Sequence, residues 1–334
     1  MPLIRTVALA ILAVSLAAAA PPTASAQAPT AAGGRQKLVV RFTWKLTTYY
    51  APLFVALDRG YYAQDGLDVQ LVEGSGAETV VKMVGLGTDK IAYGPATVAA
   101  EAASRDLPVT VVAVYLPKVP IGLASFPDVV LKTPKGLEGK RLGVSIGETF
   151  SNMLLPFARL NGVDLSKVTT VQLEPSARNT QFLARRIDVM SLYLVDQLPL
   201  LESKTGMKFN ILNVADFGLG LLGQGFIVNS AFATADPGAI HKLLHGTAKG
   251  YAETFRDPAA AVRIMRSHMT IKPDFDVMMA QLKATLDATA VPAGKPLGWQ
   301  DPALWQANLN LLKETAQIKQ IKDLGAYFTN AYLQ

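Results

Sequence analysis

Cysteine is absent from the 334 residues of this chain, and histidine occurs only three times. The absence of cysteine excludes disulfide bridges, thiolate nucleophiles and cysteine-ligated metal sites. It also excludes a lipid-anchored bacterial lipoprotein, which needs a cysteine at its processed N-terminus. His241 and His245 lie four residues apart, but the residues between them supply neither a glutamate nor a third ligand. We therefore expect no metal site.

The chain also has little excess charge, because 32 basic residues against 26 acidic ones leave a net charge of +6. Its longest basic clusters are the pairs Lys140-Arg141 and Arg185-Arg186, which do not form the basic stripe typical of nucleic-acid binding. Half of the residues are hydrophobic and 17% are charged, as in proteins with packed cores. We therefore expect about two folded domains that do not bind nucleic acid.

The first residues have the composition of an export signal. Arg5 supplies a basic start, an apolar run spans Val7–Ala20, and small residues follow up to Ala26. The apolar run is shorter than the roughly 20 residues that span a bilayer, and this order of features is typical of a secretory signal peptide. We expect residues 1–26 to be a cleaved signal peptide and residues 27–36 a flexible tether, so that the mature protein is soluble and exported.

From residue 37 onward, short β-branched runs alternate with longer helical patterns. Lys37–Phe42 predicts a strand, and Ala51–Ala63 predicts a helix that tolerates a proline in its first turn. Strands that alternate with helices at this spacing are typical of βαβ units, so we expect an α/β fold with mostly parallel sheets flanked by helices. After residue 229 the pattern is helical only. The predicted tail helices are Pro237–Arg256, Pro258–His268, Pro273–Ala288, Pro302–Lys313 and Ile321–Leu333.

This helical tail indicates how the chain divides. Two sequential α/β domains would leave the tail without a sheet to cover. We therefore expect the chain to leave one lobe near residue 120 and to return to it near residue 216. Lobe I is then discontinuous, with residues 37–120 and 216–334, and lobe II comprises residues 121–215.

Four stretches carry a recurring family pattern. They are 44–56 (WKLTTYYAPLFVA) with 58–62 and 66–69 after it, 137–144 (LEGKRLGV), 186–189 (RIDV), and 298–299 (GW) through 327–330 (YFTN). Together and in this order they resemble the periplasmic solute-binding proteins of ABC importers. The branch is the one that takes taurine, aliphatic sulfonates, nitrate or the pyrimidine precursor of thiamine.

The resemblance covers essentially the whole mature chain and implies a two-lobed periplasmic-binding-protein fold of type II. Such a fold has a hinge of crossing strands and, here, a helical C-terminal tail. The resemblance further implies a periplasmic, monomeric protein without cofactor or catalytic residues, which captures a small-molecule ligand between its lobes. The closed form would then dock on a membrane permease that works with an ATPase.

The loops after the strands are the expected ligand site, because ligands of open α/β sheets bind beyond the carboxyl ends of the strands, at helix N-termini. Aromatic rings there can stack on a planar ligand, and hydroxyl groups can exchange hydrogen bonds with it. The same residue types also serve as helix caps, tight turns and packing residues. The candidate ligand-binding residues are Trp44, Thr47, Thr48, Tyr50, Tyr93, Gly94, Gly147, Glu148, Thr149, Ser151, Ser176, Arg178 and Tyr193.

Two of these candidates favour different ligands. Arg178 suits a sulfonate or carboxylate, which a guanidinium binds through two parallel hydrogen bonds, although a solvated arginine is the alternative. Glu148 would repel an anion and favours a ligand with amino groups. Because the aromatic residues favour a planar heterocycle, we expect a pyrimidine like the thiamine precursor or another small organic solute, with a sulfonate such as taurine as the alternative.

Two other functions stay open. An exported ligand sensor would dock on a receptor instead of a permease. A synthase of the thiamine pyrimidine resembles the same family, but it needs an iron-linked cysteine-rich motif and a reactive histidine. Since the chain has no cysteine and its histidines lie outside the predicted cleft loops, we expect a binding protein rather than an enzyme.

Overall fold

The computed structural model describes residues 34–145, 148–290 and 292–333. The predicted signal peptide and most of the predicted tether lie outside these residues, and residue 36 already belongs to the first strand. Residues Arg35–Gln334 form one compact unit, so the lobe boundaries near residues 120 and 216 stay predictions. Every helix in the described part of the chain is too short or too polar to cross a bilayer.

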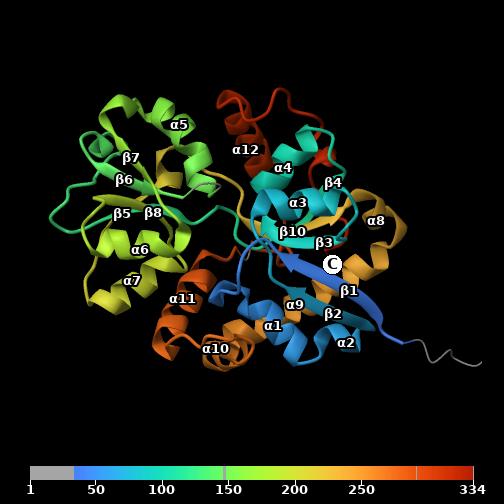
Figure 1. The fold of residues 1–334 in the computed structure, drawn as a ribbon. Helices are drawn as coiled ribbons and strands as arrows, with labels where there is room; N and C mark the ends of the chain where they lie inside the picture. The colour runs from blue at the N-terminus through green and yellow to red at the C-terminus, as the bar shows by residue number, and fades with distance from the viewer. Residues whose placement is uncertain (1–33, 146–147, 291, 334) are drawn as a thin grey trace, which may run out of the picture. The chain divides into compact units, whose positions relative to one another are not determined.

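The first sheet contains Gln36–Phe42 (β1), Leu67–Val72 (β2), Ile91–Pro95 (β3), Val109–Val114 (β4) and Gln224–Asn229 (β10). Their order is β2-β1-β3-β10-β4 (Figure 1). β1 pairs in parallel with β2 and β3, whereas β10 runs antiparallel to β3 and β4. The carboxyl ends of β1 and β3 therefore lie at the same edge of the sheet.

The second sheet contains Ile121–Ser125 (β5), Arg141–Val144 (β6), Thr169–Gln172 (β7), Val189–Tyr193 (β8) and Asn210–Asn213 (β9). Their order is β7-β6-β8-β5-β9. β6 pairs in parallel with β7 and β8, whereas β5 runs antiparallel to β8 and β9. The carboxyl ends of β6 and β8 again share one edge.

The strands β5 and β10 are the points at which the chain changes sheet. The chain passes from β4 in the first sheet to β5 in the second, and it returns from β9 in the second sheet to β10 in the first. Each arriving strand runs against its neighbours, whereas the other four strands of its sheet share one direction. The two sheets are therefore mixed but mostly parallel, as expected. Two crossings of this kind are the arrangement in which a hinge is expected.

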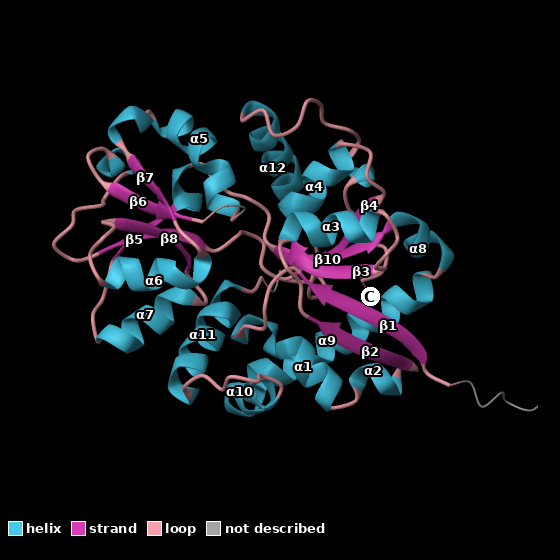
Figure 2. Ribbon diagram, in the orientation of Figure 1, coloured by secondary structure: helices cyan, strands magenta, loops and turns pink. Residues whose placement is uncertain are grey.

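Helices cover both faces of the first sheet (Figure 2). They are Ala51–Asp58 (α1), Tyr61–Gln64 (α2), Ala77–Gly85 (α3), Ala96–Ser104 (α4), Ser230–Ala235 (α8), Pro237–Arg256 (α9) and Pro258–Ser267 (α10). Successive side chains of a strand point to opposite faces. Accordingly, Ala92 of β3 joins the core under α3 and α4, whereas Ile91 and Tyr93 join the core with α1 and α9.

The second sheet is covered in the same way by Thr149–Asn161 (α5) on one face and by Pro175–Leu183 (α6) and Gln197–Thr205 (α7) on the other. Two tail helices follow, Phe275–Ala288 (α11) and Pro302–Glu314 (α12). α11 packs against α10, against α7 and against the 3-10 turn Thr48–Tyr50. It therefore contacts elements that follow strands of both sheets.

The last predicted tail helix, Ile321–Leu333, is wrong. This segment contains only a 3-10 turn at Leu324–Ala326 and then runs beside β4, which is an edge strand. The Val111 N–H donates to the Tyr327 carbonyl at 2.9 Å, and the Thr329 N–H donates to the Val111 carbonyl at 3.0 Å. The tail thus pairs with backbone groups that an open edge would leave exposed, a long-range contact that helical periodicity does not reveal.

The predicted helix Ala51–Ala63 is interrupted at Gly60, which has φ 69° and separates α1 from α2. This left-handed conformation favours glycine over residues with a side chain. The short helix α8 was not predicted, although its N-cap signal is present: the Asn229 side chain accepts a hydrogen bond from the Phe232 N–H at 3.1 Å.

Candidate ligand-binding site

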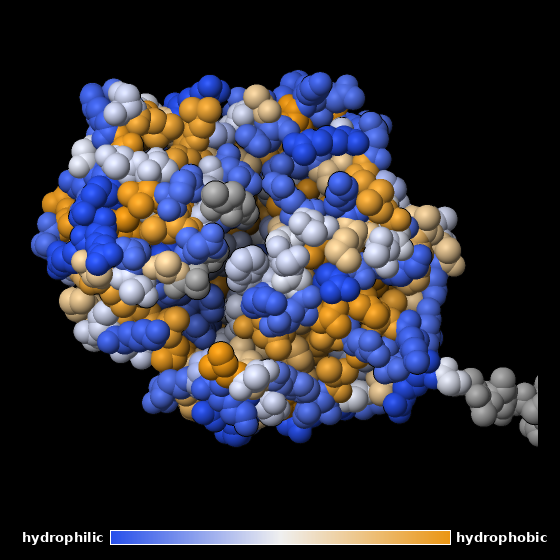
Figure 3. Space-filling model, in the orientation of Figure 1, coloured by the Kyte–Doolittle hydropathy of each residue, from blue (hydrophilic) through white to orange (hydrophobic). Residues whose placement is uncertain are grey.

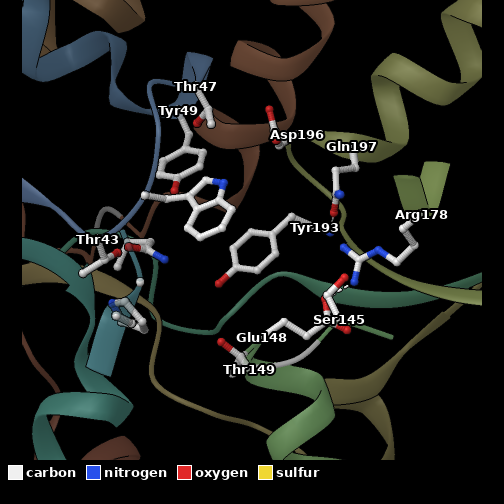
Figure 4. A pocket seen from close by; sticks show the side chains of 15 residues that line it. Thr43, Thr47, Tyr49, Ser145, Glu148, Thr149, Arg178, Tyr193, Asp196 and Gln197 are labelled. Carbon is white, nitrogen blue, oxygen red and sulfur yellow. Dashed lines mark hydrogen bonds and ion pairs between the residues drawn. The ribbon is translucent and has the colours of Figure 1, made fainter. Parts of the chain in front are cut away.

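The face of the molecule that Figure 3 shows does not single out a site, because polar and apolar residues are interspersed over it. The described residues instead enclose a cavity of about 570 Å³, within the range of small-molecule sites. Figure 4 shows side chains from both sheets' loops converging on it. The lining residues are Thr43, Trp44, Thr47, Tyr49, Gly76, Ala77, Pro95, Ser145, Glu148, Thr149, Arg178, Tyr193, Asp196, Gln197 and Gln224.

Sheet topology explains why these residues meet. Thr43 directly follows β1 and Pro95 ends β3, so both lie at the shared carboxyl edge of the first sheet. Ser145 directly follows β6 and Tyr193 ends β8, at the shared carboxyl edge of the second sheet. Gln224 begins the returning strand β10. The cavity thus lies at strand ends of both sheets and beside the start of β10, where open α/β folds bind ligands.

Arg178 and Glu148 form an ion pair on the wall of the cavity, between α6 and the N-terminus of α5. Arg178 is only 5% exposed, and its Nη1 also donates to the Ser191 hydroxyl at 3.2 Å. That hydroxyl in turn donates to Glu148 Oε1. The positive charge of Arg178, which we expected to bind an anion, is therefore balanced by Glu148.

Several polar atoms of the cavity have no hydrogen-bond partner among the residues that the structure describes. They are Thr47 Oγ1, Ser145 Oγ, Arg178 Nε and Gln224 Oε1, and all four are buried. Buried polar groups are almost always hydrogen-bonded in folded proteins, because leaving them unpaired costs free energy. The lining therefore offers both donors and acceptors to a ligand or to water that fills the cavity.

Asp196 is the second acidic side chain of the lining, and no salt bridge joins it to a described residue. Its Oδ1 accepts a hydrogen bond from Gln281 Nε2 at 3.0 Å. Burial disfavours the charged carboxylate and raises the pKa of Asp196 to about 6. Near neutral pH the cavity thus carries one acidic group that no basic side chain balances.

Three aromatic side chains line the cavity: Trp44, Tyr49 and Tyr193. Trp44 is 44% exposed, which is unusual for the largest apolar side chain. In Figure 4 the Tyr193 ring projects between Tyr49 and the pair Glu148 and Thr149. Burial raises the pKa of the Tyr193 phenol to about 12, against the opposing effect of hydrogen bonds with Thr149 and Gln224. Tyr193 therefore stays protonated and can donate or accept.

Six of the predicted site residues line the cavity, namely Trp44, Thr47, Glu148, Thr149, Arg178 and Tyr193. Their role in binding stays a prediction. Gly147 lies outside the described residues, and so does the side chain of Ser176.

The five other candidates do not line the cavity. Tyr50 is fully buried and stacks on Phe42, with 3.9 Å between the ring centroids. Tyr93 is buried as well, and its hydroxyl hydrogen-bonds that of Tyr251 at 3.1 Å. Tyr50 and Tyr93 are therefore packing residues, which was the alternative to ligand binding.

Each of the remaining three candidates contacts a residue of the lining or a residue that is hydrogen-bonded to the lining. Thr48 donates from its hydroxyl to Gln281 Oε1 at 2.6 Å. Ser151 donates to the Glu148 carbonyl at 3.0 Å, as a residue in a first helical turn can. Gly94 is buried so closely against the Thr43 side chain that a Cβ would overlap it.

Sequence reasoning missed nine lining residues. Thr43, Pro95 and Ser145 adjoin the predicted strand ends, so a wider reading of the same rule would have included them. Asp196 is the N-cap and Gln197 the first residue of α7, a helix start that no proline marks at its first position. No local signal identifies Gln224, which begins β10, the strand by which the chain returns from the second sheet to the first. The others are Tyr49, Gly76 and Ala77.

The sequence is similar to a known protein family and to several known proteins. The model of a family described as NMT1/THI5 like matches residues 47–261. The chain is similar to the riboflavin-binding protein RibY of Chloroflexus aurantiacus, with 24% identity over 89% of this chain and 86% of that protein. It is also similar to the formylaminopyrimidine-binding protein of Halalkalibacterium halodurans, with 23% identity over 82% and 83% of the two chains.

An enzyme is found among the relatives too. The 4-amino-5-hydroxymethyl-2-methylpyrimidine phosphate synthase of Aspergillus parasiticus is 23% identical over 71% of each chain. Among solved structures, the periplasmic aliphatic sulphonate binding protein SsuA of Escherichia coli aligns with a TM-score of 0.68 and 15% identity, over 87% of this chain and 91% of that one. The chain therefore has the two-sheet fold of periplasmic binding proteins, as the sequence predicted.

Proposed function

Because the chain belongs to the NMT1/THI5-like family, we propose that it is the solute-binding component of an ABC importer. In this role it captures a planar organic solute in the cavity and delivers it to a membrane permease. The proposal is supported by two relatives that are named as binding proteins and that align over more than four fifths of this chain. The predicted signal peptide would export such a protein to the periplasm, where it acts as a monomer.

The charge of the cavity is the observation that carries the choice of ligand. Arg178 is balanced by Glu148, whereas Asp196 has no basic partner among the described residues. A sulfonate or nitrate ion that moves from water into this cavity would lie near an unbalanced carboxylate, which costs free energy. A neutral or amine-bearing ring would instead donate a hydrogen bond to Asp196.

The aromatic side chains support the same class of ligand. Trp44 and Tyr49 come from the first sheet's loop, and Tyr193 comes from the end of β8 in the second sheet. Aromatic rings that approach from two sides can hold a planar ring by stacking. The unpaired polar atoms Arg178 Nε and Gln224 Oε1 would then bind an acceptor and a donor on the edge of that ring.

Capture of the ligand needs no chemistry by the protein. A solute that touches Thr47 on one side and Ser145 or Tyr193 on the other stabilises the arrangement in which both sheets' loops are close. Closure about the crossing strands β5 and β10 follows, and the closed form is the one that docks on the permease. A receptor that reads the same closed form would make the protein a sensor, which a pull-down with the membrane partner would reveal.

The synthase relative does not change this proposal. The chain has no cysteine, and no histidine is among the residues that line the cavity. The groups that bind and orient a ligand are present, whereas the iron-linked cysteines and reactive histidine that the resemblance requires of the synthase are not in this site.

The test is a thermal-shift and calorimetric screen of protein that has been unfolded and refolded to remove bound solutes. The probes are formylaminopyrimidine, 4-amino-5-hydroxymethyl-2-methylpyrimidine, riboflavin, taurine, an alkanesulfonate and nitrate. A ligand at 100 times its Kd adds about 2.7 kcal/mol to the free energy of unfolding, which raises Tm by several degrees. We expect a shift with an uncharged or amine-bearing ring. A shift with taurine or nitrate alone would contradict the assigned ligand class, and turnover of the pyrimidine would contradict the binding role.

A further inference from the structure

A buried glutamine on α11 connects the two loops that face each other at the cavity. Gln281 is 6% exposed, although a glutamine is polar and usually lies at the surface. Its Oε1 accepts the Thr48 hydroxyl at 2.6 Å, and its Nε2 donates to the Asp196 carbonyl at 2.8 Å and to Asp196 Oδ1 at 3.0 Å. One side chain thus joins the turn after β1 to the N-cap residue of α7.

The hydrogen-bond pattern fixes the orientation of this amide. An amide nitrogen carries two donors and the amide oxygen only accepts. If the Gln281 amide were turned over, its oxygen would face two acceptors, the carbonyl and the carboxylate of Asp196. The orientation in the structure, with Nε2 toward Asp196 and Oε1 toward the Thr48 hydroxyl, is therefore the one that pairs each donor with an acceptor.

The other buried polar side chains of α11 behave differently. Thr285 donates to the Gln281 carbonyl at 2.9 Å, and the following Thr289 donates to the Thr285 carbonyl at 2.9 Å. Both hydroxyls are satisfied within their own helix turn, as threonines in helices often are. Gln281, by contrast, reaches across to a residue that lines the cavity.

We propose that Gln281 is a positioning residue that holds the Asp196 carboxylate toward the cavity and thereby sets the preference for ligands with a hydrogen-bond donor. The amide occupies Oδ1 and the backbone carbonyl of Asp196, so the side chain cannot rotate away, and Oδ2 stays available to a ligand. Thr48 fixes the far end of the same amide. This explains how Thr48, a predicted binding residue, contributes to the site from outside its lining.

The inference rests on the proposed function, since it names the group that selects the ligand. Its test is a double-mutant cycle of Gln281→Leu and Asp196→Asn, with 4-amino-5-hydroxymethyl-2-methylpyrimidine as the titrant in calorimetry. We expect Gln281→Leu to weaken binding about tenfold, the value of one hydrogen bond to a charged group. In the Asp196→Asn background the same change should have almost no further effect, because residues that act through one another are not additive.

Thr285→Val is the matched control, one turn along the same buried helix face, because the Thr285 hydroxyl donates to the Gln281 carbonyl and not to Asp196. It should leave the affinity unchanged. A titration with the corresponding pyrimidine that lacks the amino group gives the selectivity, which Gln281→Leu should reduce. Equal losses for both pyrimidines, or an undiminished loss in the Asp196→Asn background, would overturn the proposal in favour of a packing role.

A second measurement needs no ligand. With ¹³C-labelled aspartate, NMR can follow the titration of Asp196 in the wild-type protein and in Gln281→Leu. Removal of the donor to Oδ1 should raise the pKa of Asp196 further, because the donor stabilises the charged form. An unchanged titration would refute the positioning role even if no probe binds. If the titration responds but no pyrimidine binds, the assigned ligand class is wrong and the role of Gln281 stands.

Two tyrosines near Asp196 do not titrate in the same range. The phenols of Tyr49 and Tyr50 face it, and burial raises the pKa of both far above neutrality. Of the three charged residues on α11, Lys283 and Asp287 pair with each other at 2.6 Å on the exposed side of the helix, and Asp276 lies in its first turn. The titration that is lost in Asp196→Asn can be assigned to the Asp196 carboxyl.

Discussion

Glu148 and Arg178 neutralise each other at the cavity although they belong to different helices. The carboxylate of Glu148 stands at the N-cap of α5, and the guanidinium of Arg178 approaches it from α6, with Ser191 joined to both. From the sequence these two residues favoured opposite ligands. Paired with each other, the two charges cancel. The selectivity of the cavity then depends on its remaining hydrogen-bond donors and acceptors.

This pairing predicts that Glu148→Gln converts the site into one for anions. The substitution leaves a buried guanidinium uncompensated, so the protein should lose at most about 3 kcal/mol of its free energy of unfolding in urea. Taurine should then bind at least about tenfold more tightly than to the wild-type protein in calorimetry, because its sulfonate replaces the lost carboxylate.

The matched control for this charge change is Asp188→Asn, which breaks the pair with Arg141 (2.7 Å), a partner that is 45% exposed. An exposed pair of this kind contributes less than about 1 kcal/mol, and its loss should not alter the affinity for taurine. Equal behaviour of the two variants would mean that the Glu148–Arg178 pair does not control the charge of the cavity.

Asp196 predicts a particular dependence of stability on pH. Its pKa in the folded protein is raised to about 6, above the value of roughly 3.9 for an unfolded chain. Between these values the folded state holds a proton that the unfolded state has lost, so stability falls as pH rises from about 4 to about 6 and is then constant.

The variant Asp196→Asn should remove this part of the fall. Relative to wild type it should gain about 1–2 kcal/mol between pH 4 and pH 7, a value reduced by the partial exposure of the side chain. Urea unfolding at several pH values measures the difference. In the wild-type protein, binding of an uncharged amine-bearing ring should weaken below pH 6, and binding that strengthens there would contradict the role of the carboxylate.

Trp44 should matter to the ligand more than to the fold. Its side chain is 44% exposed, so Trp44→Ala should change the free energy of unfolding by about 0.5 kcal/mol or less. The loss of a stacking surface should weaken binding of a planar solute about tenfold. Phe255→Ala is a matched control on α9, because Phe255 is 42% exposed and does not line the cavity. Equal effects of the two substitutions on affinity would exclude stacking by Trp44.

The sequence predicted most of the elements, because hydrophobic period and helix-start signals are local. It also predicted that loops after strands bear the site, which places Thr47, Glu148 and Tyr193 at the cavity. It could not separate Tyr49 from Tyr50, since a 3-10 turn has no amphipathic period long enough to read. The structure sends Tyr49 to the cavity and stacks Tyr50 on Phe42.

Contacts between distant parts of the chain were beyond prediction for a different reason. Gln224 reaches the cavity only because β10 returns between β3 and β4, and Gln281 reaches Asp196 only because α11 packs against α7. A single sequence carries no signal for such packing. The same holds for residues 327–329, whose pairing with β4 replaced a predicted helix.

Gly94 gives a test of how packing behind the cavity shapes it. A Cβ at this position would overlap the side chain of Thr43, which lines the cavity. Gly94→Ala should therefore cost about 1–3 kcal/mol of stability, as overpacking does, and should weaken binding by displacing Thr43. Thr43→Ala removes the overlapping methyl and hydroxyl, so the double variant should recover most of the stability lost by Gly94→Ala. Recovery of stability without recovery of affinity would indicate that the Thr43 side chain itself contacts the ligand, whereas additive losses in urea unfolding would show that the two residues do not interact.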